Sequence, residues 1–188
     1  DALLLIGTNP RWEAPIINAR IRKRWLSGQL KIAMIGPKVD LTYDYQHIGF
    51  GPESLRQLSS GQPGFSEVLK SAKAPMVIVG MGAVTRPDGA AVLAAISAWA
   101  EKSGMIGSVG DNTWNGFNVL HTAAARVAAL DMGFVPQQGG RDRDDIIKGC
   151  AAGDIEVLYL LGADEMDMQK LGKAFVIYQG HHGDAGAH

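Results

Sequence analysis

The residues with the clearest potential for chemistry lie just after short apolar runs, in turns that begin with glycine. Residues 3–6 are apolar and lead into Gly7, Thr8 and Asn9, a proline follows, and Glu13 comes shortly after. A turn of this kind between a strand and a helix can bind phosphate through its backbone N–H groups and the helix N-terminus. The alternative is a tight strand-to-helix turn without a ligand, in which glycine permits unusual backbone angles and proline ends the strand.

Two further glycine turns follow the same pattern. Residues 76–79 run into Gly80 and Gly82, and a third apolar run is followed by Gly-Ala and then Asp164. Carboxylates at strand ends, here Glu13 and Asp164, can bind the hydroxyl groups of a ribose, although lone carboxylates are also common as helix caps or solvated groups. None of the three turns is a G-x-G-x-x-G or P-loop sequence, so a nucleotide site and an ordinary turn both stay open.

Other side chains suited to chemistry are isolated in the sequence. His181, His182 and Asp184 have types that bind metals, but adjacent histidines on an extended segment point to opposite sides. Cys150 has no evident histidine partner, and His121 lies in an apolar stretch. No serine, cysteine or paired-carboxylate arrangement is recognisable. We therefore expect no catalytic residue and no metal site in this chain.

Composition excludes several classes of protein. The 188 residues are 46% hydrophobic and 20% charged, with a formal net charge of −1, so neither disorder nor a general affinity for nucleic acid is expected. A basic cluster at residues 20–24 indicates either a partner-binding face or a solvated helix surface. A single cysteine excludes an internal disulfide and a cluster held within the chain. No apolar run approaches the roughly 20 residues that span a bilayer, so we expect no direct membrane insertion. Because Asp1 opens almost directly into a strand, we expect the chain to be part of a longer protein.

The apolar runs and the helical patterns between them predict an α/β fold with Rossmann-like parallel sheets and flanking helices. A helix over 16–26 joins the first two strands, which makes a right-handed parallel crossover. We expect a first lobe over 1–72 and a second α/β lobe over 73–188, with a boundary within 104–118 as the alternative. Residues 105–116 are expected to form a loop and residues 118–130 a helix that includes His121. The expected strands are 3–6, 30–35, 76–79, 155–161 and 174–178, with a short one near 47–48.

The first and last motifs also carry a family resemblance, which extends over the whole chain. The sequence L-L-L-I-G-T-N-P-R-W-E-A-P at residues 3–15 and Y-Q-G-H-H-G-D at residues 178–184 resemble the large iron–sulfur subunit of respiratory NADH:quinone oxidoreductase, complex I, in its C-terminal molybdopterin-oxidoreductase-like region. Weaker matches lie at 18–23, 39–43, 88–91, 128–131 and 160–164.

The resemblance implies a role in an electron-transferring respiratory complex. In the family, [4Fe-4S] and [2Fe-2S] clusters lie in an N-terminal region that this chain lacks. In related molybdenum enzymes the turn corresponding to residues 7–15 helps to hold molybdopterin guanine dinucleotide, whereas in complex I this lobe is taken to be structural. The resemblance thus implies a non-catalytic domain in which Gly7, Thr8, Asn9, Glu13, Gly80, Gly82 and Asp164 are remnants of a cofactor site.

Its expected partners are the rest of its own subunit and other subunits of the soluble arm. It would be peripheral, on the cytoplasmic face of the bacterial inner membrane or the matrix side of the mitochondrial one. The alternatives are a pterin-dinucleotide-binding domain of an active molybdenum oxidoreductase and a generic nucleotide-binding module.

Overall fold

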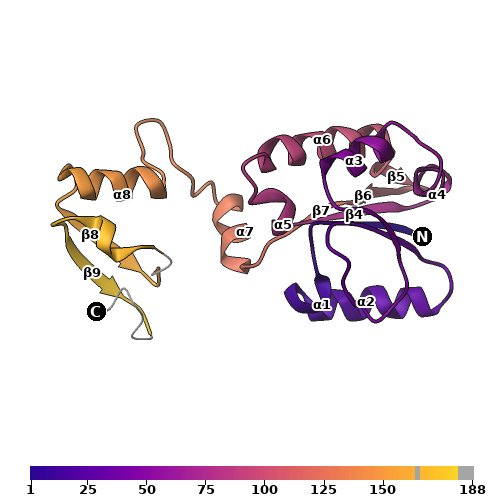
Figure 1. Cartoon of the computed structure of the whole chain (residues 1–188), viewed down its shortest axis with the longest axis horizontal. Helices are drawn as coiled ribbons and strands as arrows, with labels where there is room; N and C mark the ends of the chain where they lie inside the picture. The colour runs from indigo at the N-terminus through magenta and orange to yellow at the C-terminus, as the bar shows by residue number, and fades with distance from the viewer. Residues whose placement is uncertain (164–165, 182–188) are drawn as a thin grey trace. The chain divides into compact units, whose positions relative to one another are not determined.

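In the computed structural model the chain divides into two compact units, Asp1–Ala124 and Ala125–His188, and the structure describes residues 1–163 and 166–181. The first unit is built on a five-stranded parallel sheet in the order β3-β2-β1-β4-β7. Figure 1 shows this unit with helices on both sides of its strands. The chain first winds outward from β1 through β2 to β3, and it then returns to place β4 and β7 on the other side of β1. The expected parallel α/β fold is thereby confirmed. The strands are β1 (Ala2–Ile6), β2 (Lys31–Ile35), β3 (Gln46–Gly49), β4 (Pro75–Gly80) and β7 (Phe117–Leu120).

The central strand β1 is buried on both faces, which explains its continuous apolar sequence. All five of its residues are buried, and Leu4 lies opposite Ala33 of β2 and Val77 of β4. Parallel sheets are covered by helices on both faces, so an inner strand has no polar side to present to water.

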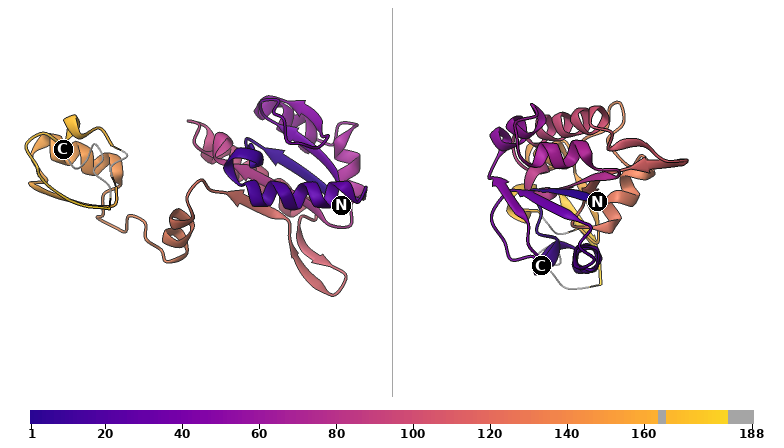
Figure 2. Two further views of the ribbon diagram at one scale, coloured as in Figure 1. Left: turned by 90° about the horizontal axis from the view of Figure 1, so that it is seen from below. Right: turned by 90° about the vertical axis from the view of Figure 1, so that its right-hand side faces the viewer.

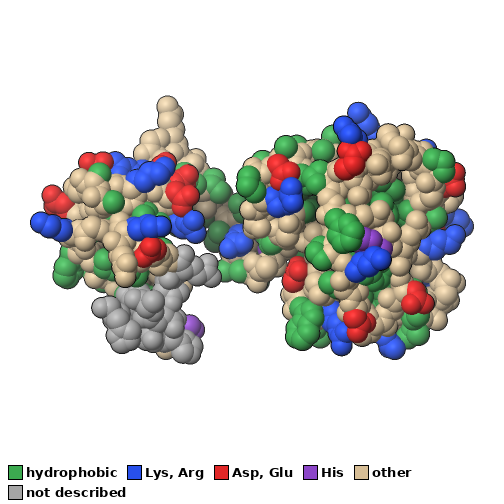
Figure 3. Space-filling model, in the orientation of Figure 1, with side chains coloured by type: hydrophobic (Ala, Val, Ile, Leu, Met, Phe, Trp, Pro, Cys, Tyr) green, Lys and Arg blue, Asp and Glu red, His purple; other side chains and the backbone are tan. Residues whose placement is uncertain are grey.

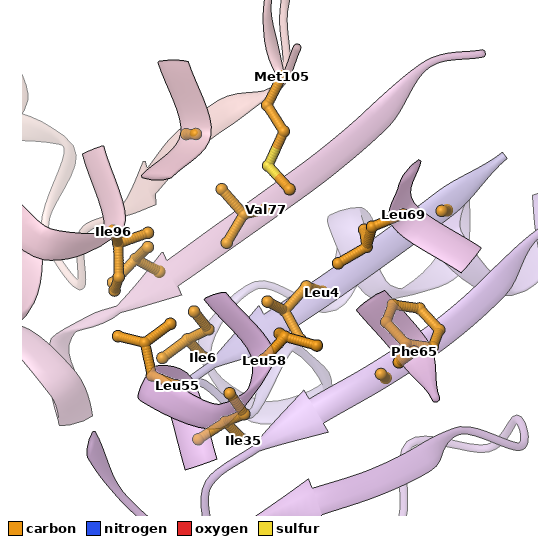
Figure 4. Packing of buried hydrophobic residues seen from close by; sticks show 14 of the residues in the cluster. Leu4, Ile6, Ile35, Leu55, Leu58, Phe65, Leu69, Val77, Ile96 and Met105 are labelled. Carbon is orange, nitrogen blue, oxygen red and sulfur yellow. The ribbon is translucent and has the colours of Figure 1, made fainter. Parts of the chain in front are cut away.

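Helices form a layer on each face of this sheet. Leu4 and Ile6 point into a core that also contains buried residues of α3 (Pro52–Ser59), α4 (Phe65–Ser71) and α6 (Gly89–Lys102), as Figure 4 shows. Leu3 and Leu5 pack on the opposite face with Ile21 of α2 (Pro15–Leu26). Two short helices, α1 (Pro10–Glu13) and α5 (Met81–Val84), follow β1 and β4 directly. The carboxyl ends of β1 and β4 therefore lead straight into turns at one edge of the sheet.

The lobe boundary expected at residue 72 falls inside the first compact unit. It lies between α4 and β4, and β4 pairs with β1 over five residues, from Ala2 opposite Pro75 to Ile6 opposite Val79. The two segments on either side of residue 72 therefore contribute strands to one sheet.

Two expected elements between residues 105 and 130 are wrong. Residues 105–116 contain an antiparallel hairpin of β5 (Ile106–Val109) and β6 (Asn112–Asn115), which projects from the sheet in both views of Figure 2. Residues 117–120 form β7 instead of helix, and α7 (Ala124–Asp131) begins only afterwards. His121 therefore lies after a strand and not within a helix. Pairing with β4, which places Phe117 opposite Val77, outweighs the helical spacing of the apolar residues.

The second unit contains a two-stranded parallel sheet. β8 (Val157–Leu161) pairs with β9 (Phe175–Gln179). α8 (Arg143–Ala152) and a 3-10 helix, η1 (Met168–Leu171), share a small core with one face of it. The alternate residues of β8 and β9, which do not face this core, include five large apolar side chains that expose 40–68% of their surface: Val157, Tyr159, Leu161, Phe175 and Ile177. Asp142 caps the start of α8, because its carboxylate accepts the Asp145 N–H at 2.8 Å.

Within the described ranges, 1–163 and 166–181, no helix has the length and apolar character needed to cross a membrane.

Candidate functional site

The turn after β1 is held by its own backbone and by β2. Gly7 adopts a φ of +58°, a left-handed conformation that glycine reaches without strain. Its N–H donates to the Ile35 carbonyl oxygen at 2.9 Å, so this donor is used at the end of the sheet. The predicted tight turn between strand and helix is therefore present.

Glu13 folds back over this turn and occupies its hydrogen-bond donors. One carboxylate oxygen accepts the Thr8 hydroxyl at 2.8 Å, and the other accepts the Asn9 N–H at 2.7 Å. The Asn9 side chain makes no capping bond, and its Oδ1 is buried without a hydrogen-bond partner among the described residues. An acidic side chain thus lies where the turn and the positive end of a helix would otherwise attract an anion.

The ends of β1 and β4 approach so closely that only glycine fits. A Cβ added at Gly82 would lie 2.7 Å from the Gly7 carbonyl oxygen, and one at Gly80 would lie 2.4 Å from the Thr8 Cβ. A Cβ at Gly7 would lie 2.5 Å from the Ala83 nitrogen. The chain adds strands on one side of β1 first and then on the other, beginning with β4. Between the ends of β1 and β4, where this direction changes, packed backbone therefore fills the space.

A cavity of about 380 Å³ opens beside this packed turn, at the carboxyl ends of β1 and β2. Its walls are mainly apolar, and Ile6, Ile35 and Leu55 of its lining lie close together in Figure 4. Phe50 lies at this cavity with 72% of its surface exposed, and its ring meets the His47 ring edge to face at 4.7 Å. The polar side chains of the lining are Thr8, Asn9, Glu13 and Arg86.

The cation of this lining is already paired. Arg86 donates to both carboxylate oxygens of Asp88, at 2.7 and 3.0 Å. The hydrogen bond from Arg86 lowers the pKa of Asp88 below its usual range, which is the effect expected of a guanidinium beside a carboxylate. Glu13, in contrast, forms no ion pair among the described residues, so it gives the cavity an unbalanced negative charge.

The structure brings Gly7, Thr8, Asn9, Glu13, Gly80 and Gly82 together at one edge of the sheet, whereas Asp164 lies outside the described residues. His182 and Asp184 also lie outside them. Within the described part of the chain, no group of three His, Cys, Asp or Glu side chains could hold a metal ion. Cys150 is 1% exposed and packs in the small apolar core of the second unit.

The basic cluster at residues 20–24 lies on the exposed part of α2. Arg20, Lys23 and Arg24 are exposed, and Arg22 donates to the Thr42 carbonyl oxygen at 3.2 Å. On the face that Figure 3 shows, basic and acidic side chains are interspersed over both units. No broad basic surface is visible there.

The fold and the whole sequence define the class of protein. Residues 1–188 match the family model for molybdopterin oxidoreductase, and the chain belongs to this family. Its sequence is 42% identical over its full length to the mitochondrial NADH dehydrogenase [ubiquinone] iron-sulfur protein 1 of Solanum tuberosum. It is also 42% identical to an NADH-quinone oxidoreductase subunit of Rickettsia bellii and 37% identical to the NADH-ubiquinone oxidoreductase 75 kDa subunit of Reclinomonas americana. The chain spans only 24–26% of the length of these relatives.

A solved structure shows the same fold at lower similarity. It is the formyltransferase/hydrolase complex (FhcABCD) of Methylorubrum extorquens, in complex with methylofuran. The match has a TM-score of 0.57, with 17% sequence identity, and it covers 98% of this chain and 60% of that chain. These relatives confirm the resemblance to the large iron–sulfur subunit of complex I, which the sequence motifs indicate.

The residues at the end of β1 do not fit the phosphates of a pterin dinucleotide. The N–H groups of Gly7 and Asn9 and the Thr8 hydroxyl are engaged within the chain, and Glu13 would repel an added phosphate.

The sequence indicates this turn but not the cavity beside it. Phe50, Leu55 and Arg86 have no local motif, and the strand order brings them into the lining of the same cavity as Glu13.

Proposed function

We propose that this chain is a non-catalytic structural domain of the large iron–sulfur subunit of NADH:quinone oxidoreductase. Identities of 37–42% over the whole chain to subunits of that enzyme support the assignment. The observation that carries the structural role is the engagement of Glu13 with both Thr8 and Asn9. This engagement stabilises the turn while it occupies two donors, the Thr8 hydroxyl and the Asn9 N–H, that a phosphate group could use.

In this proposal Gly7, Gly80 and Gly82 serve packing. Their lack of a side chain lets the ends of β1 and β4 approach within van der Waals distance, and this approach fixes α5 against the sheet. The cofactor-site remnants inferred from the sequence are then structural residues. Asp164 belongs to the same proposal on sequence grounds alone.

The enzyme as a whole would transfer electrons from NADH to quinone. Its [4Fe-4S] and [2Fe-2S] clusters would be held by other parts of the large subunit, in keeping with the iron-sulfur name of the potato relative. This domain would contact the rest of that subunit and neighbouring subunits of the soluble arm. It would be peripheral to the membrane, on the cytoplasmic face in bacteria or the matrix side in mitochondria.

The alternative is a dinucleotide-binding domain of an active molybdenum oxidoreductase. The parallel sheet and the family match support the ancestry of such a site. The carboxylate of Glu13 at the end of β1, which forms no ion pair with any described residue, argues against present use of such a site, because a phosphate group placed there would meet a like charge.

The test is turnover of the assembled enzyme that carries Glu13→Gln or Asn9→Ala in its large subunit. Both variants are expected to retain NADH:quinone turnover per assembled complex to within about twofold, because neither residue would contact a reacting group. Glu53→Gln, which alters an exposed carboxylate of α3 paired with Arg56, is the matched control. A loss of more than about tenfold in either variant, with assembly and the control unaffected, would reject the proposal.

A further inference from the structure

The polar groups of the cavity at β1 and β2 are unusually rich in acceptors. Glu13 presents a carboxylate with no ion pair among the described residues, and each of its oxygens accepts only one hydrogen bond within the described chain. A carboxylate oxygen can accept a second bond, so each oxygen of Glu13, a residue of the cavity lining, retains capacity for one more donor. Arg86, the cation of the lining, is bound to both oxygens of Asp88.

Asn9 adds an unused acceptor next to this carboxylate. Its Oδ1 is buried and has no hydrogen-bond partner among the described residues, and an unpaired buried acceptor is costly. The Asn9 backbone nitrogen lies 2.7 Å from Glu13 Oε1, and both residues line the cavity. Because Asn9 Oδ1 is buried, the exposed Glu13 carboxylate is the acceptor that a ligand in the cavity can reach without a rearrangement of the turn.

The remaining lining suits an apolar body. Ile6, Met34, Leu55 and Val92 contribute to the walls, and the exposed ring of Phe50 offers an aromatic face or edge at the cavity. An aromatic face attracts a cation as well as a flat apolar group. A volume of about 380 Å³ is within the range of small-molecule sites.

We propose that this cavity binds a small organic cation, in which an amidinium, guanidinium or primary ammonium group is carried on an apolar body. The cationic group would donate to the Glu13 carboxylate, and the apolar body would contact Phe50 and Leu55. The inference rests on the proposed function, because it requires that the end of β1 no longer takes phosphate. It assigns to the same edge of the sheet a ligand of opposite charge.

The test is a series of NMR titrations of the ¹⁵N-labelled 188-residue chain with probes of matched shape. Benzamidine is expected to bind with a Kd on the order of 1 mM and to shift the backbone amides of Thr8, Asn9 and Phe50. Benzamide, which is neutral, and benzoate, which is anionic, are expected to bind at least about tenfold more weakly. N-acetyl-arginine amide is the second cationic probe. Tighter binding of benzamidine would indicate a free small molecule as the ligand, whereas tighter binding of N-acetyl-arginine amide would indicate an arginine side chain of a partner protein.

Two variants identify the residues responsible. Glu13→Gln is expected to weaken benzamidine binding about tenfold or more, since it removes the charge from the hydrogen bond, while Glu53→Gln leaves binding unchanged. Phe50→Ala, at an exposed position that the fold does not require, is expected to weaken binding of both cationic probes. It keeps the test decisive if Glu13→Gln does not fold.

Different results would contradict this inference and the proposed function. Absence of cation binding, equal binding of benzoate, or benzamidine binding insensitive to both variants would overturn the inference alone. Saturable binding of GDP that shifts the amides of residues 7–9 would overturn the proposed function as well.

Discussion

Replacing Gly7 by alanine tests the close packing at the end of β1 most sharply. Gly7 has a φ of +58°, and an added Cβ would lie 2.5 Å from the Ala83 nitrogen and 2.7 Å from the Ala83 Cβ. Gly28, at the end of α2, has a φ of +73° and nothing within 4 Å of an added Cβ. The two glycines therefore share a left-handed backbone conformation and differ in the space around them.

The expected magnitudes follow from this difference. A left-handed conformation costs a residue with a side chain about 1–2 kcal/mol, so Gly28→Ala should lower the free energy of unfolding by about that amount. Gly7→Ala incurs the same cost and in addition about 1–3 kcal/mol for inserting a methyl group against backbone that has little freedom to move. The free energy of unfolding should thus fall about 1–3 kcal/mol further in Gly7→Ala than in Gly28→Ala.

Unfolding in urea, followed by tryptophan fluorescence, measures this difference in stability for the unit that contains Gly7 and Gly28. All four tryptophans, at positions 12, 25, 99 and 114, lie in the unit Asp1–Ala124, so the transition reports that unit alone. An equal loss of stability in the two variants would show that the approach of Gly7 to Ala83 is not tight. A Gly7→Ala protein as stable as the unsubstituted chain would show that neither the backbone conformation nor the packing at this position restricts the residue.

Two further stability predictions concern other elements. Burial raises the pKa of Tyr43 above its ordinary value, and its hydroxyl donates to Asn18 Oδ1 at 2.8 Å. Stability from neutral Tyr43 is fully present below pH ~10 and should fall by about 1.4 kcal/mol per pH unit above it. Tyr43→Phe should lower the free energy of unfolding by about 1–3 kcal/mol at pH 7 and reduce this alkaline slope in urea titrations; an unchanged slope would contradict the assignment. Asp142→Ala removes the cap on the Asp145 N–H and should lower protection of the first turn of α8 in hydrogen exchange by about 1 kcal/mol. Equal protection in the two proteins would show that the cap is not needed.

The sheet could be predicted where apolar runs end on glycine. The runs of β1 and β4 are continuous because both faces of these strands are covered, and this pattern is readable without coordinates. The hairpin of β5 and β6 was not predictable in the same way, since most of its residues are exposed and its sequence is rich in Gly and Asn. The sequence predicts helix from residue 118 onward because valines and alanines recur at helical spacing, whereas the pairing of Phe117 with Val77 is remote in sequence.

The candidate site could be located from the sequence but its chemistry could not be read from it. The turn at Gly7 and the glycines at 80 and 82 mark strand ends, and the structure places them together. Its position after a strand indicates Glu13 as a ligand for ribose hydroxyls, and the structure shows its carboxylate bonded to Thr8 and Asn9. A side chain that turns back onto its own loop gives no signal in composition or spacing. The cavity likewise depends on Phe50 and Leu55, which the strand order brings near β1.

Cofactor retention tests most directly whether Glu13 closes the end of β1 to phosphate. The intact large subunit would be purified natively from a host that synthesises molybdopterin guanine dinucleotide, then denatured, and the released small molecules measured by mass spectrometry with molybdenum measured by elemental analysis. We predict no guanine nucleotide and no molybdenum above background. One equivalent of either per large subunit would show that this edge of the sheet still holds the dinucleotide and that the domain is not purely structural.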